Sequence, residues 1–330
     1  MQKPKISIIV PIYNRREYIA KTLDNLLGQT IRDIDIICVN DGSTDGTEKV
    51  LAEYAKKDKR IKVMNKDNGG CSTSRNAGLK QCRAEYIMFC DSDDLFDLTM
   101  CEKMYKAMTK EIDIAICGIK VEYLAHNEIK YSDDIYYNLD FNKEQEISDE
   151  VIHKTDTSVC NKIFRKSIIE KYGISFPEQL NNEDYYFYNA YMSVSKKAYF
   201  VNEKLYYYIR HDDSIMSDNF DGDIYSPDHL LIAQKLFSFY EKNGFLKEHM
   251  NLFWTQFVES FWFSYNHSSK QYRKKILGIA KKFINDHKKD YPPTTIKMKN
   301  AVGEIINMNP FVKAMKKMRS AIGKVRRKIK

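Results

Sequence analysis

Short apolar segments alternate with amphipathic segments through the first 120 residues, and this alternation constrains the fold more than any other feature. The apolar runs predict strands at Lys5–Val10, Ile34–Asn40, Ile61–Asn65, Glu85–Cys90 and Ile112–Cys117. The segments between them have the spacing of helices, at about Arg15–Leu27, Thr44–Lys57, Ser72–Gln81 and Thr99–Met108. Strands and helices that alternate in this way favour an α/β fold, a mostly parallel sheet with helices on both faces.

Polar loops follow each of the first four predicted strands. Their sequences are PIYNRREY (Pro11–Tyr18), VNDGSTDGT (Val39–Thr47), NKDNGGCSTSRNAG (Asn65–Gly78) and CDSDD (Cys90–Asp94). Ligands of open parallel sheets bind outside the carboxyl ends of the strands, where such loops meet. The sequence therefore predicts one binding site formed by the four loops together.

The last of these loops places three carboxylates, Asp91, Asp93 and Asp94, within four positions. Such groups repel one another unless solvent, hydrogen bonds or a cation offsets their charge. The alternative to a functional role is a solvated loop in which one aspartate caps the next helix. Because this loop is one of four at the expected binding edge, we favour a functional role for its carboxylates.

The VNDGSTDGT loop has two structural interpretations besides a binding role. A calcium loop is disfavoured because its twelfth position is Ala52, where a bidentate glutamate is needed. As a turn into a helix the segment fits well, with Gly42 in the turn and Ser43 or Thr44 as the helix cap. Neither interpretation explains Asp41 at the strand end, where a carboxylate could accept hydrogen bonds from the imide or hydroxyls of a nucleoside.

The NGGCSTSRNAG loop enters a helix but lacks both common phosphate-binding patterns. It has no Gly-x-Gly-x-x-Gly spacing and no Gly-Lys-Ser or Gly-Lys-Thr, so neither a dinucleotide fold nor a P-loop is indicated. Arg75 stands in the first helical turn, where the helix dipole disfavours a cation. It would suit a phosphate group there, or it could form an ordinary surface salt bridge.

The basic charge of the chain is concentrated at its C-terminus. The net charge is +8, and residues 311–330 contain nine Lys or Arg and no acid, so the charges of the remaining residues nearly cancel. An apolar stripe runs through the same segment at spacings of three and four: Phe311, Met315, Met318, Ile322, Val325 and Ile329. A basic amphipathic helix over 310–330 favours binding to an anionic membrane surface, with packing on protein as the alternative. The remainder shows no basic patch for nucleic acid.

Hydropathy and cysteine spacing both favour a cytoplasmic protein. No segment approaches the roughly 18–20 apolar residues of a membrane-spanning helix, and ISIIVP near the N-terminus is too short for a signal-peptide core. The seven cysteines show no Cys-x-x-Cys pair and no paired spacing, which disfavours a zinc site and a disulfide framework.

Four motifs, in this order and spacing, resemble the family 2 glycosyltransferases of the GT-A fold: ISIIVPIYNRREYI, VNDGSTDGT, NGGCSTSRNAGL and YIMFCDSDD. The resemblance is dense over residues 5–100, thinner to about 215, and absent beyond. It implies a nucleotide-sugar donor held by the first four strand-end loops, and it does not specify the sugar.

The family pattern assigns roles by position. The residues that would line the donor pocket are Pro11, Tyr13, Asn14, Glu17, Asp41, Asn68, Arg75, Asp91, Ser92 and, further along, Ser214. Asp41 would meet the base and Asp91 the ribose. Asn68 and Arg75 would contact the base or the phosphates.

The resemblance also implies a divalent cation, held by Asp93 with His211 as a further ligand. Oxygen ligands favour Mg²⁺ or Mn²⁺, and the cation would neutralise charge that builds on the leaving diphosphate. His211 lies in YYYIRHDDSIMS (Tyr206–Ser217), which resembles the family's strand followed by Arg, His and Ser. A structural role for this histidine is the alternative.

Downstream, NNEDYYFYNAY (Asn181–Tyr191) places an acidic pair at the start of a helix expected over Asp184–Ser193. Alone, Glu183 and Asp184 are favourable first-turn residues. By the family pattern, Asp184 would be the general base that takes the proton of the acceptor hydroxyl, and Glu183 would orient the acceptor. Asn182 stands where the family commonly has glycine.

Three features outside these motifs complete the structural expectation. NKIFRKS (Asn161–Ser167) also resembles a family segment, and its Lys162 could approach the site. Short strands are expected at Ala198–Val201 and Leu205–Ile209, and the chain after Asp223 is expected to be helical.

We therefore expect a GT-A catalytic domain over residues 1–220, with a nucleotide-sugar half over about 1–118 and an acceptor half over about 119–220. A helical region at 221–309 and the basic helix at 310–330 would follow. The expected activity is metal-dependent, inverting transfer of a hexosyl group from a UDP-sugar to a hydroxyl of a cell-surface glycan or lipid-linked acceptor. The enzyme would lie on the inner face of the plasma membrane and could form a homodimer.

Three other classes of protein share some of these features. A nucleotidyltransferase should carry a glycine-rich basic loop after its first strand, but PIYNRREY has no glycine. A glycoside hydrolase would also use two carboxylates, but it needs no nucleotide pocket. A non-catalytic nucleotide-sugar-binding subunit would lack the base, whereas Glu183 and Asp184 are both present.

Overall fold

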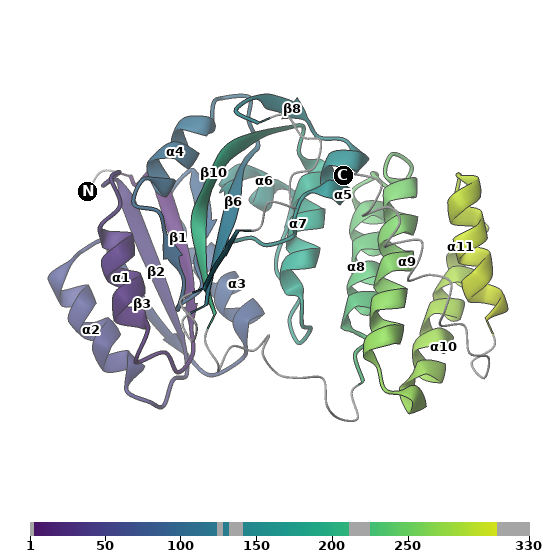
Figure 1. The fold of residues 1–330 in the computed structure, drawn as a ribbon, viewed down its shortest axis with the longest axis horizontal. Helices are drawn as coiled ribbons and strands as arrows, with labels where there is room; N and C mark the ends of the chain where they lie inside the picture. The colour runs from purple at the N-terminus through teal and green to yellow at the C-terminus, as the bar shows by residue number, and fades with distance from the viewer. Residues whose placement is uncertain (1–2, 124–127, 132–140, 211–224, 309–330) are drawn as a thin grey trace.

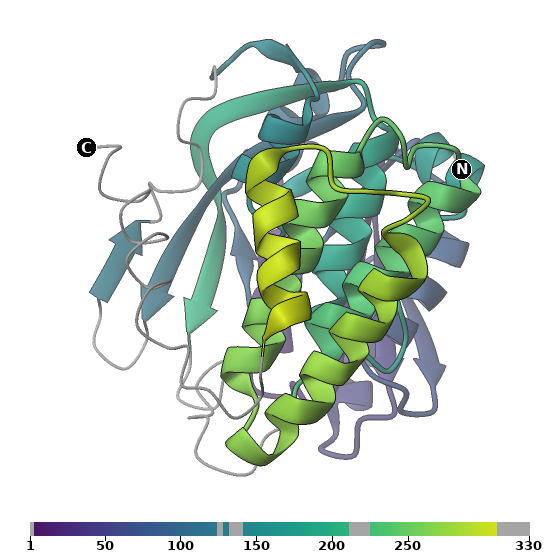
Figure 2. The same ribbon diagram turned by 90° about the vertical axis from the view of Figure 1, so that its right-hand side faces the viewer.

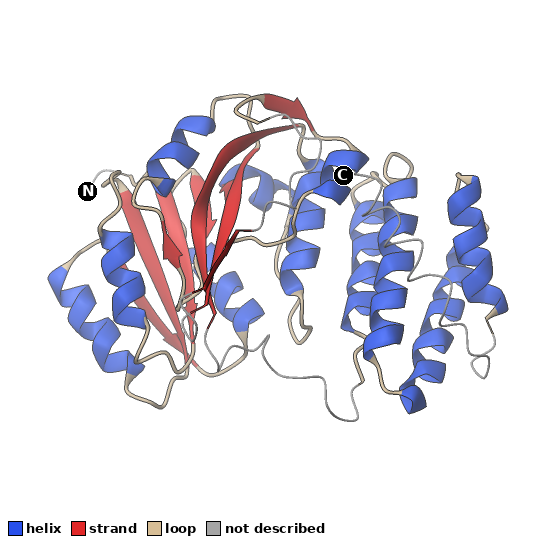
Figure 3. Ribbon diagram, in the orientation of Figure 1, coloured by secondary structure: helices blue, strands red, loops and turns tan. Residues whose placement is uncertain are grey.

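The computed structural model describes residues 3–123, 128–131, 141–210 and 225–308, which form a sheet flanked by helices and a further stack of helices (Figure 1, Figure 3). The strands are β1 (Ile6–Ile12), β2 (Ile34–Asp41), β3 (Ile61–Lys66), β4 (Tyr86–Phe89), β5 (Leu95–Phe96), β6 (Ile114–Tyr123), β7 (Glu128–Tyr131), β8 (Glu144–Glu146), β9 (Lys162–Arg165) and β10 (Lys197–Arg210). The helices are α1 (Ile19–Leu27), α2 (Thr47–Lys57), α3 (Cys71–Gln81), α4 (Met100–Ala107), α5 (Asp149–Lys154), α6 (Lys166–Tyr172), α7 (Glu183–Val194), α8 (Asp228–Lys242), α9 (Met250–His267), α10 (Lys270–His287) and α11 (Ile296–Asn307).

The strands of the main sheet have the order β3-β2-β1-β4-β9-β6-β10-β5. The pairs β1–β2, β1–β4, β2–β3 and β6–β10 are parallel, while β9 runs antiparallel between β4 and β6. Helices α1 and α2 lie on one side of the sheet, and α3 and α7 lie on the other (Figure 1). The predicted α/β fold with a mostly parallel sheet is confirmed.

The apolar runs of the sequence form the centre of this sheet. Every residue of β1 and β2 is buried, as expected for strands covered on both faces. Helix α3 packs directly on β1: a Cβ atom at Gly78 would lie 2.5 Å from Cγ2 of Ile9, so the helix can approach this closely only at a glycine. The carboxyl ends of β1 to β4 are therefore held at one edge of a rigid layer.

Helix α1 begins four residues later than predicted, at Ile19 in place of Arg15. The amides of Asn14 and Arg15 donate to Ser43 Oγ at 2.9 Å and to Thr47 Oγ1 at 3.0 Å. These donors belong to a loop between β1 and the helix, and they bind the neighbouring loop after β2. Residues 15–18, which the local pattern assigns to the first turn of a helix, therefore belong to a loop that is hydrogen-bonded to the neighbouring loop.

Helix α2 begins at Thr47, and neither Ser43 nor Thr44 caps it, so that part of the prediction is wrong. The residue before the helix is Gly46, whose φ is +93°. The carboxylate of Asp45 accepts the amide of Thr47 at 2.9 Å. Ser43 lies three residues before Gly46, the residue at the capping position, and its hydroxyl accepts from the amide of Asn14 in the loop after β1.

The two short strands predicted on either side of Asn202 form one strand, β10. Asn202 and Glu203 are exposed and interrupt the apolar pattern, while register shifts between Val201 and Tyr206 let the backbone continue. The pattern misses β9 because four residues are too few to show a period. Strand β6 extends beyond its predicted end at Cys117 and pairs there with β7.

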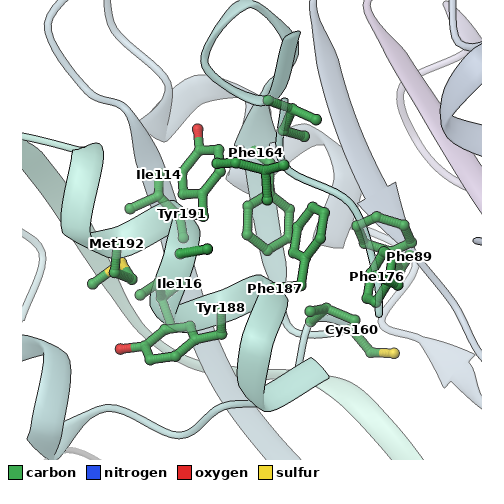
Figure 4. Packing of buried hydrophobic residues seen from close by; sticks show 14 of the residues in the cluster. Phe89, Ile114, Ile116, Cys160, Phe164, Phe176, Phe187, Tyr188, Tyr191 and Met192 are labelled. Atoms are coloured by element: carbon green, nitrogen blue, oxygen red, sulfur yellow. The ribbon is translucent and has the colours of Figure 1, made fainter. Parts of the chain in front are cut away.

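An aromatic cluster joins the sheet to α7 (Figure 4). Phe89 of β4, Phe164 of β9 and Phe187 of α7 pack edge to face, with ring centroids 5.5–5.8 Å apart. Phe176 stacks on Phe187 at 4.2 Å. All residues of α7 from Phe187 to Ser193 are buried, so this helix is covered by the sheet on one side and by α8 on the other.

Helices α8 to α11 form the stack beyond α7 (Figure 2). Helix α8 packs on α7, α9 packs on α8, and α10 and α11 pack on α9. Trp254 is fully buried in α9. Among the described helices, none combines the length and apolar composition needed to span a membrane. The predicted basic helix at 310–330 lies outside the described residues, and the proposed domain boundaries stay predictions.

His249, at the start of α9, ties this stack to α5 and α7. Its side chain is buried, with Nδ1 2.7 Å from Asp149 Oδ1 and Nε2 3.0 Å from the carbonyl oxygen of Ser193. Both partners can accept hydrogen bonds, so this geometry favours the imidazolium form, in which both ring nitrogens donate. Burial alone would lower the pKa of His249, but the hydrogen bond and charge of Asp149 outweigh it and raise the pKa.

We expect this contact to make protein stability depend on pH. Because the folded-state pKa of His249 lies above its unfolded value, the contribution is complete below about pH 6.5 and is lost as pH rises through the folded-state pKa. His249→Gln should therefore lower the free energy of unfolding by about 1–3 kcal/mol near pH 6 and by less near pH 9, measured by urea denaturation. His153→Gln is the control: this histidine lies 3.6 Å from Glu259 in a half-exposed pair, and because exposed pairs contribute little, the variant should show little difference. An equal effect of His249→Gln at both pH values would contradict the charged pair.

Candidate active site

The loops after β1 and β2 are hydrogen-bonded to each other through Asn14, whose φ is +50°. The amide of Asn14 donates to Ser43 Oγ at 2.9 Å, and its Oδ1 accepts the amide of Thr44 at 2.8 Å. The neighbouring side chain, Tyr13, is 47% exposed at the same edge. Asn14 therefore shapes the predicted donor pocket, and a direct contact with the donor stays a prediction.

Asp41, at the end of β2, organises the loop after β3. Its carboxylate accepts the amide of Gly70 at 2.7 Å and pairs with the ammonium of Lys66. Gly42 follows with a φ of +72°, and a Cβ atom there would lie 2.9 Å from the amide nitrogen of Asn68. The second and third loops therefore form one unit. The contact of Asp41 with a nucleotide base stays a prediction.

Arg75 of α3 joins two segments that the sequence motifs treat separately. Its Nη2 lies 2.9 Å from Asp91 Oδ1, and its Nη1 lies 2.7 Å from Glu183 Oε1, 108 residues further along the chain. The arginine is buried, with its guanidinium over the ring of Phe176 at 5.2 Å. The alternative of an ordinary surface salt bridge is wrong for this residue.

The three carboxylates after β4 have different partners. The side chain of Asp91 is 40% exposed and pairs with Arg75. The side chain of Asp93 is 21% exposed and lies 3.3 Å from Nε of Arg15. Asp94 is buried. Two acids therefore remain accessible at the edge of the sheet, and the third belongs to the interior.

Asp94 connects the acidic loop to β10. Its carboxylate accepts hydrogen bonds from the hydroxyl of Tyr206 and, at 2.7 Å, from the amide of Ile209. Burial, together with the charge of Asp91, raises the pKa of Asp94 well above its usual range, although both donors oppose this shift. These two hydrogen bonds thus offset part of the cost of burying the Asp94 carboxyl group. The sequence alone groups this residue with the two accessible acids.

The oxygen donors of this loop fit a hard divalent cation. Asp91 and Asp93 both present carboxylate oxygens, the ligands that Mg²⁺ and Mn²⁺ prefer. Within the described residues, no group of three acidic, His or Cys side chains could hold a metal ion, so the substrate would supply part of the coordination. The predicted ligand His211 and the predicted donor-binding residue Ser214 lie outside the described residues.

Glu183 and Asp184 open α7, as the sequence predicts. Asn182, with a φ of +64°, turns the chain into the helix, and Glu183 is engaged by Arg75. Burial raises the pKa of the Asp184 carboxyl to about 6, with the guanidinium of Arg75 opposing and the charges of Glu183 and Asp91 adding to the rise. A carboxylate with a pKa near working pH is suited to take a proton from a hydroxyl group.

Lys162 is fully buried at the start of β9 and does not line the site. Its Nζ lies 3.0 Å from Asp156 Oδ1, 2.6 Å from the carbonyl oxygen of Ser158 and 2.8 Å from Asn161 Oδ1. The ammonium of Lys162 therefore lies in the protein interior, and an influence of this residue on the site would have to act through the residues packed around it.

The other predicted donor-binding residues differ in exposure. Pro11 and Ser92 are buried, whereas Glu17 and Asn68 are exposed. Their contacts with a donor stay predictions.

Sequence reasoning misses the basic partners of the acids. Arg15 and Lys66 pair with Asp93 and Asp41, yet neither cation stands out locally, because basic residues are common in loops. The one signal in the sequence that could have found these pairs is a basic residue in a loop that the predicted sheet places next to an acidic loop.

Comparison with known proteins identifies the class. The family model described as glycosyl transferase family 2 matches residues 7–173. The chain therefore belongs to glycosyltransferase family 2 and has the GT-A fold, as the four motifs indicate.

Individual relatives agree with this assignment. EpsH of Bacillus subtilis (strain 168), named as a glycosyltransferase, is 35% identical over 219 residues, which cover 66% of this chain and 64% of EpsH. The poly(ribitol-phosphate) beta-glucosyltransferase of Bacillus spizizenii is 31% identical over 64% of this chain and 33% of its own length. The chain thus spans less than two thirds of the length of these relatives.

Solved structures extend the similarity of fold to the helical stack. TarS of S. aureus in complex with UDP-GlcNAc has a TM-score of 0.61 at 21% identity, covering 91% of this chain and 90% of the TarS chain. The same TarS fragment in complex with UDP has a TM-score of 0.55. At this identity the comparison concerns the fold alone.

Proposed function

We propose that this chain transfers a hexosyl group from a UDP-linked donor to a hydroxyl of a bacterial cell-surface glycan or lipid-linked acceptor, with inversion at the anomeric carbon. The observation that carries the proposal is the double ion pair of Arg75. It brings Asp91, in a loop suited to a nucleotide donor, together with the acidic pair that begins α7. A donor-side carboxylate and a base-side carboxylate are thereby fixed around one cation.

The donor would lie across the four strand-end loops. Asp41 would meet the base, Asp91 the ribose, and Asn68 and Arg75 the base or the phosphates. The complexes of TarS with UDP-GlcNAc and with UDP support the choice of nucleotide. The loops joined by Asn14 would form the wall of this pocket.

Asp93 would hold Mn²⁺ or Mg²⁺, with His211 as a further ligand. When bound, the cation would offset the negative charge that develops on the departing UDP. Because Arg15 lies 3.3 Å from Asp93, it would compete with a cation for one carboxylate oxygen. We therefore propose that Arg15 turns from Asp93 toward the phosphates when the donor binds.

Asp184 would act as the general base in a single displacement. The acceptor oxygen forms a bond to the anomeric carbon on the face opposite the diphosphate, the bond between that carbon and the diphosphate oxygen breaks, and the hydroxyl proton passes to Asp184. With a pKa of about 6, the carboxylate is mostly ionised at neutral pH. Glu183, fixed by Arg75, would orient the acceptor.

Two other functions give different outcomes in the same assays. A non-catalytic nucleotide-sugar-binding subunit would bind donor without turnover. A nucleotidyltransferase would form a bond at phosphorus and release pyrophosphate in place of UDP.

The metal role can be tested at Asp93. In calorimetry, UDP should bind the native protein more tightly with Mn²⁺ than with EDTA, and Asp93→Ala should remove most of that difference and most of the activity. Asp67→Ala, at an exposed carboxylate in the loop after β3, is the matched control and should behave as the native protein does. Full turnover by the native protein in EDTA would contradict a role for the metal.

The role of Asp184 can be tested by a second pair of variants. Asp184→Asn should retain UDP affinity while the rate of sugar transfer falls roughly 10²–10⁴-fold, the usual contribution of acid–base catalysis. Since the base must be ionised, kcat/KM of the native enzyme, which reports groups of the free enzyme, should rise with pH through about 6 and then level off. If Glu183→Gln is inactive and Asp184→Asn is active, the roles of the two acids are reversed.

The acceptor side of the proposal rests on the family and on the basic C-terminal segment. The named substrate of the Bacillus spizizenii relative, a poly(ribitol phosphate), supports a cell-surface glycan as acceptor. The basic apolar stripe of 310–330 supports a peripheral place on an anionic membrane at the inner face of the plasma membrane.

Deleting residues 310–330 separates membrane binding from catalysis. The truncated protein should keep its turnover on a water-soluble acceptor and should sediment less with phosphatidylglycerol vesicles. Raising the salt concentration should also release the full chain, because each basic residue near such a surface contributes about 1 kcal/mol and is screened by ions. If the truncated protein aggregates or unfolds, the stripe packs on protein and the membrane role is wrong.

A further inference from the structure

Lys162 is a buried cation that the proposed reaction does not use. Its side chain has no solvent exposure and lies among Asp156, Ser158 and Asn161, whose oxygen atoms accept from its ammonium at 2.6–3.0 Å. Removing an ammonium group from water is costly, and the energy is recovered only with good partners. A buried lysine in a packed core therefore requires an explanation.

The position of Lys162 in the sheet places it directly behind the site. It begins β9, which runs antiparallel to β4 with Ile163 opposite Met88, so Lys162 lies at the carboxyl end of β4. The acidic loop with Asp91 and Asp93 leaves the sheet at this same end. Lys162 thus lies at the edge of the sheet that carries the candidate site, but it is buried beneath the accessible side chains of that edge.

Helix α7 links this cation to the candidate base. The ammonium of Lys162 lies 5.1 Å from the centroid of the Tyr188 ring, within the range of a cation–π contact. Tyr188 and Asp184 are four residues apart in α7, so they share one face of the helix. The cation therefore lies on the side of α7 from which Asp184 projects, about one turn away.

Acids outnumber cations around this face. The charged groups that approach Asp184 from the neighbouring elements are Arg75 of α3, Asp91 after β4, Glu183 of α7 itself, and Lys162 of β9 with its partner Asp156. Arg75 is already shared by Asp91 and Glu183. Among these groups, Lys162 is consequently the second of two cations beside four acids: Asp91, Asp156, Glu183 and Asp184 itself.

We propose that Lys162 is a positioning residue for Asp184: it holds the first turns of α7 against β9 and supplies positive charge behind the base. This inference rests on the proposed role of Asp184. The charge favours the ionised carboxylate that accepts the proton, in surroundings where burial and two neighbouring acids favour the neutral form. Burial lowers the pKa of Lys162; the charge and hydrogen bond of Asp156 oppose this most, and the charge of Asp184 adds a smaller opposing effect.

A purely structural role would give a different result. In that case the ammonium would only join the segment 156–161 to β9, and removing it would change stability and kcat at all pH values alike. A charge behind the base instead shifts the pH at which the base ionises. The acid limb of the kcat–pH profile is the range in which kcat rises with pH, and it reports groups in the enzyme–substrate complex. The position of this limb distinguishes the two roles.

The experiment compares neutral and charged substitutions in the full-length enzyme with Mn²⁺ and UDP-sugar. Lys162→Gln and Lys162→Met remove the charge, and the glutamine keeps a donor for Asp156 if the methionine variant does not fold. Both should move the acid limb of kcat to higher pH by roughly 0.5–1 unit, while UDP affinity is retained. Lys162→Arg should keep the native limb even if its kcat is lower.

Tyr191→Phe is the matched structural control. The hydroxyl of Tyr191 donates to the carbonyl oxygen of Asp113 at 2.6 Å and anchors the other end of α7 without a charge. This variant should lower stability and leave the acid limb in place. A native acid limb in both neutral variants would overturn the positioning role of Lys162.

The outcomes also separate this inference from the proposed function. If Asp184→Asn is inactive and the limb of Lys162→Gln is unshifted, Asp184 keeps its role and only the inference about Lys162 fails. If Asp184→Asn is fully active, the proposed base is wrong, and the role of Lys162 falls with it.

Discussion

The double ion pair of Arg75 is the contact on which the arrangement of the site depends. It joins a loop after β4 to the first turn of α7, two segments that approach only in the folded protein. Because the guanidinium is buried, replacing Arg75 would leave Asp91 and Glu183 without their shared cation, and breaking a buried ion pair by removing one partner is strongly destabilising. The donor-side and base-side halves of the site are therefore formed together, although the sequence presents them as separate motifs.

The acids of the site avoid mutual repulsion in three different ways. Asp91 and Asp93 pair with arginines, and each keeps part of its carboxylate accessible. Asp94 is withdrawn into the core, where a tyrosine hydroxyl and a backbone amide support it. In the described part of the chain Asp184 makes no ion pair, and burial leaves it with a raised pKa. A group of similar carboxylates is thus divided by its surroundings into two accessible acids at the candidate donor site, a structural acid and a candidate base.

The sequence indicates the strands and the loops of the candidate site better than it indicates which residues of those loops are bonded to each other. The first four strands are predictable because their apolar runs are buried on both faces, and the acidic and glycine-rich loops are predictable because they follow those strands. The start of α1 is not, since Asn14 bonds to Ser43 across 29 residues. The interior place of Asp94 depends on Tyr206, 112 residues away. Such distant partners leave no local pattern, and the same holds for the short strand that begins with Lys162.

The helical stack contributes to the site through α7. Seven consecutive residues of this helix, from Phe187 to Ser193, are buried, because the sheet covers one side and α8 the other. The charged contact of His249 with Asp149 and Ser193 fixes the same layers at the far end of the helix. Asp184 and Glu183 belong to the first turn of α7, whose residues are half-buried. Loosening α8 would let water reach that turn and bring the pKa of Asp184 back toward the value of an exposed carboxyl. In the proposed mechanism the candidate base would then be weaker, so the packing of α8 on α7 would serve the proposed chemistry as well as the stability of the fold.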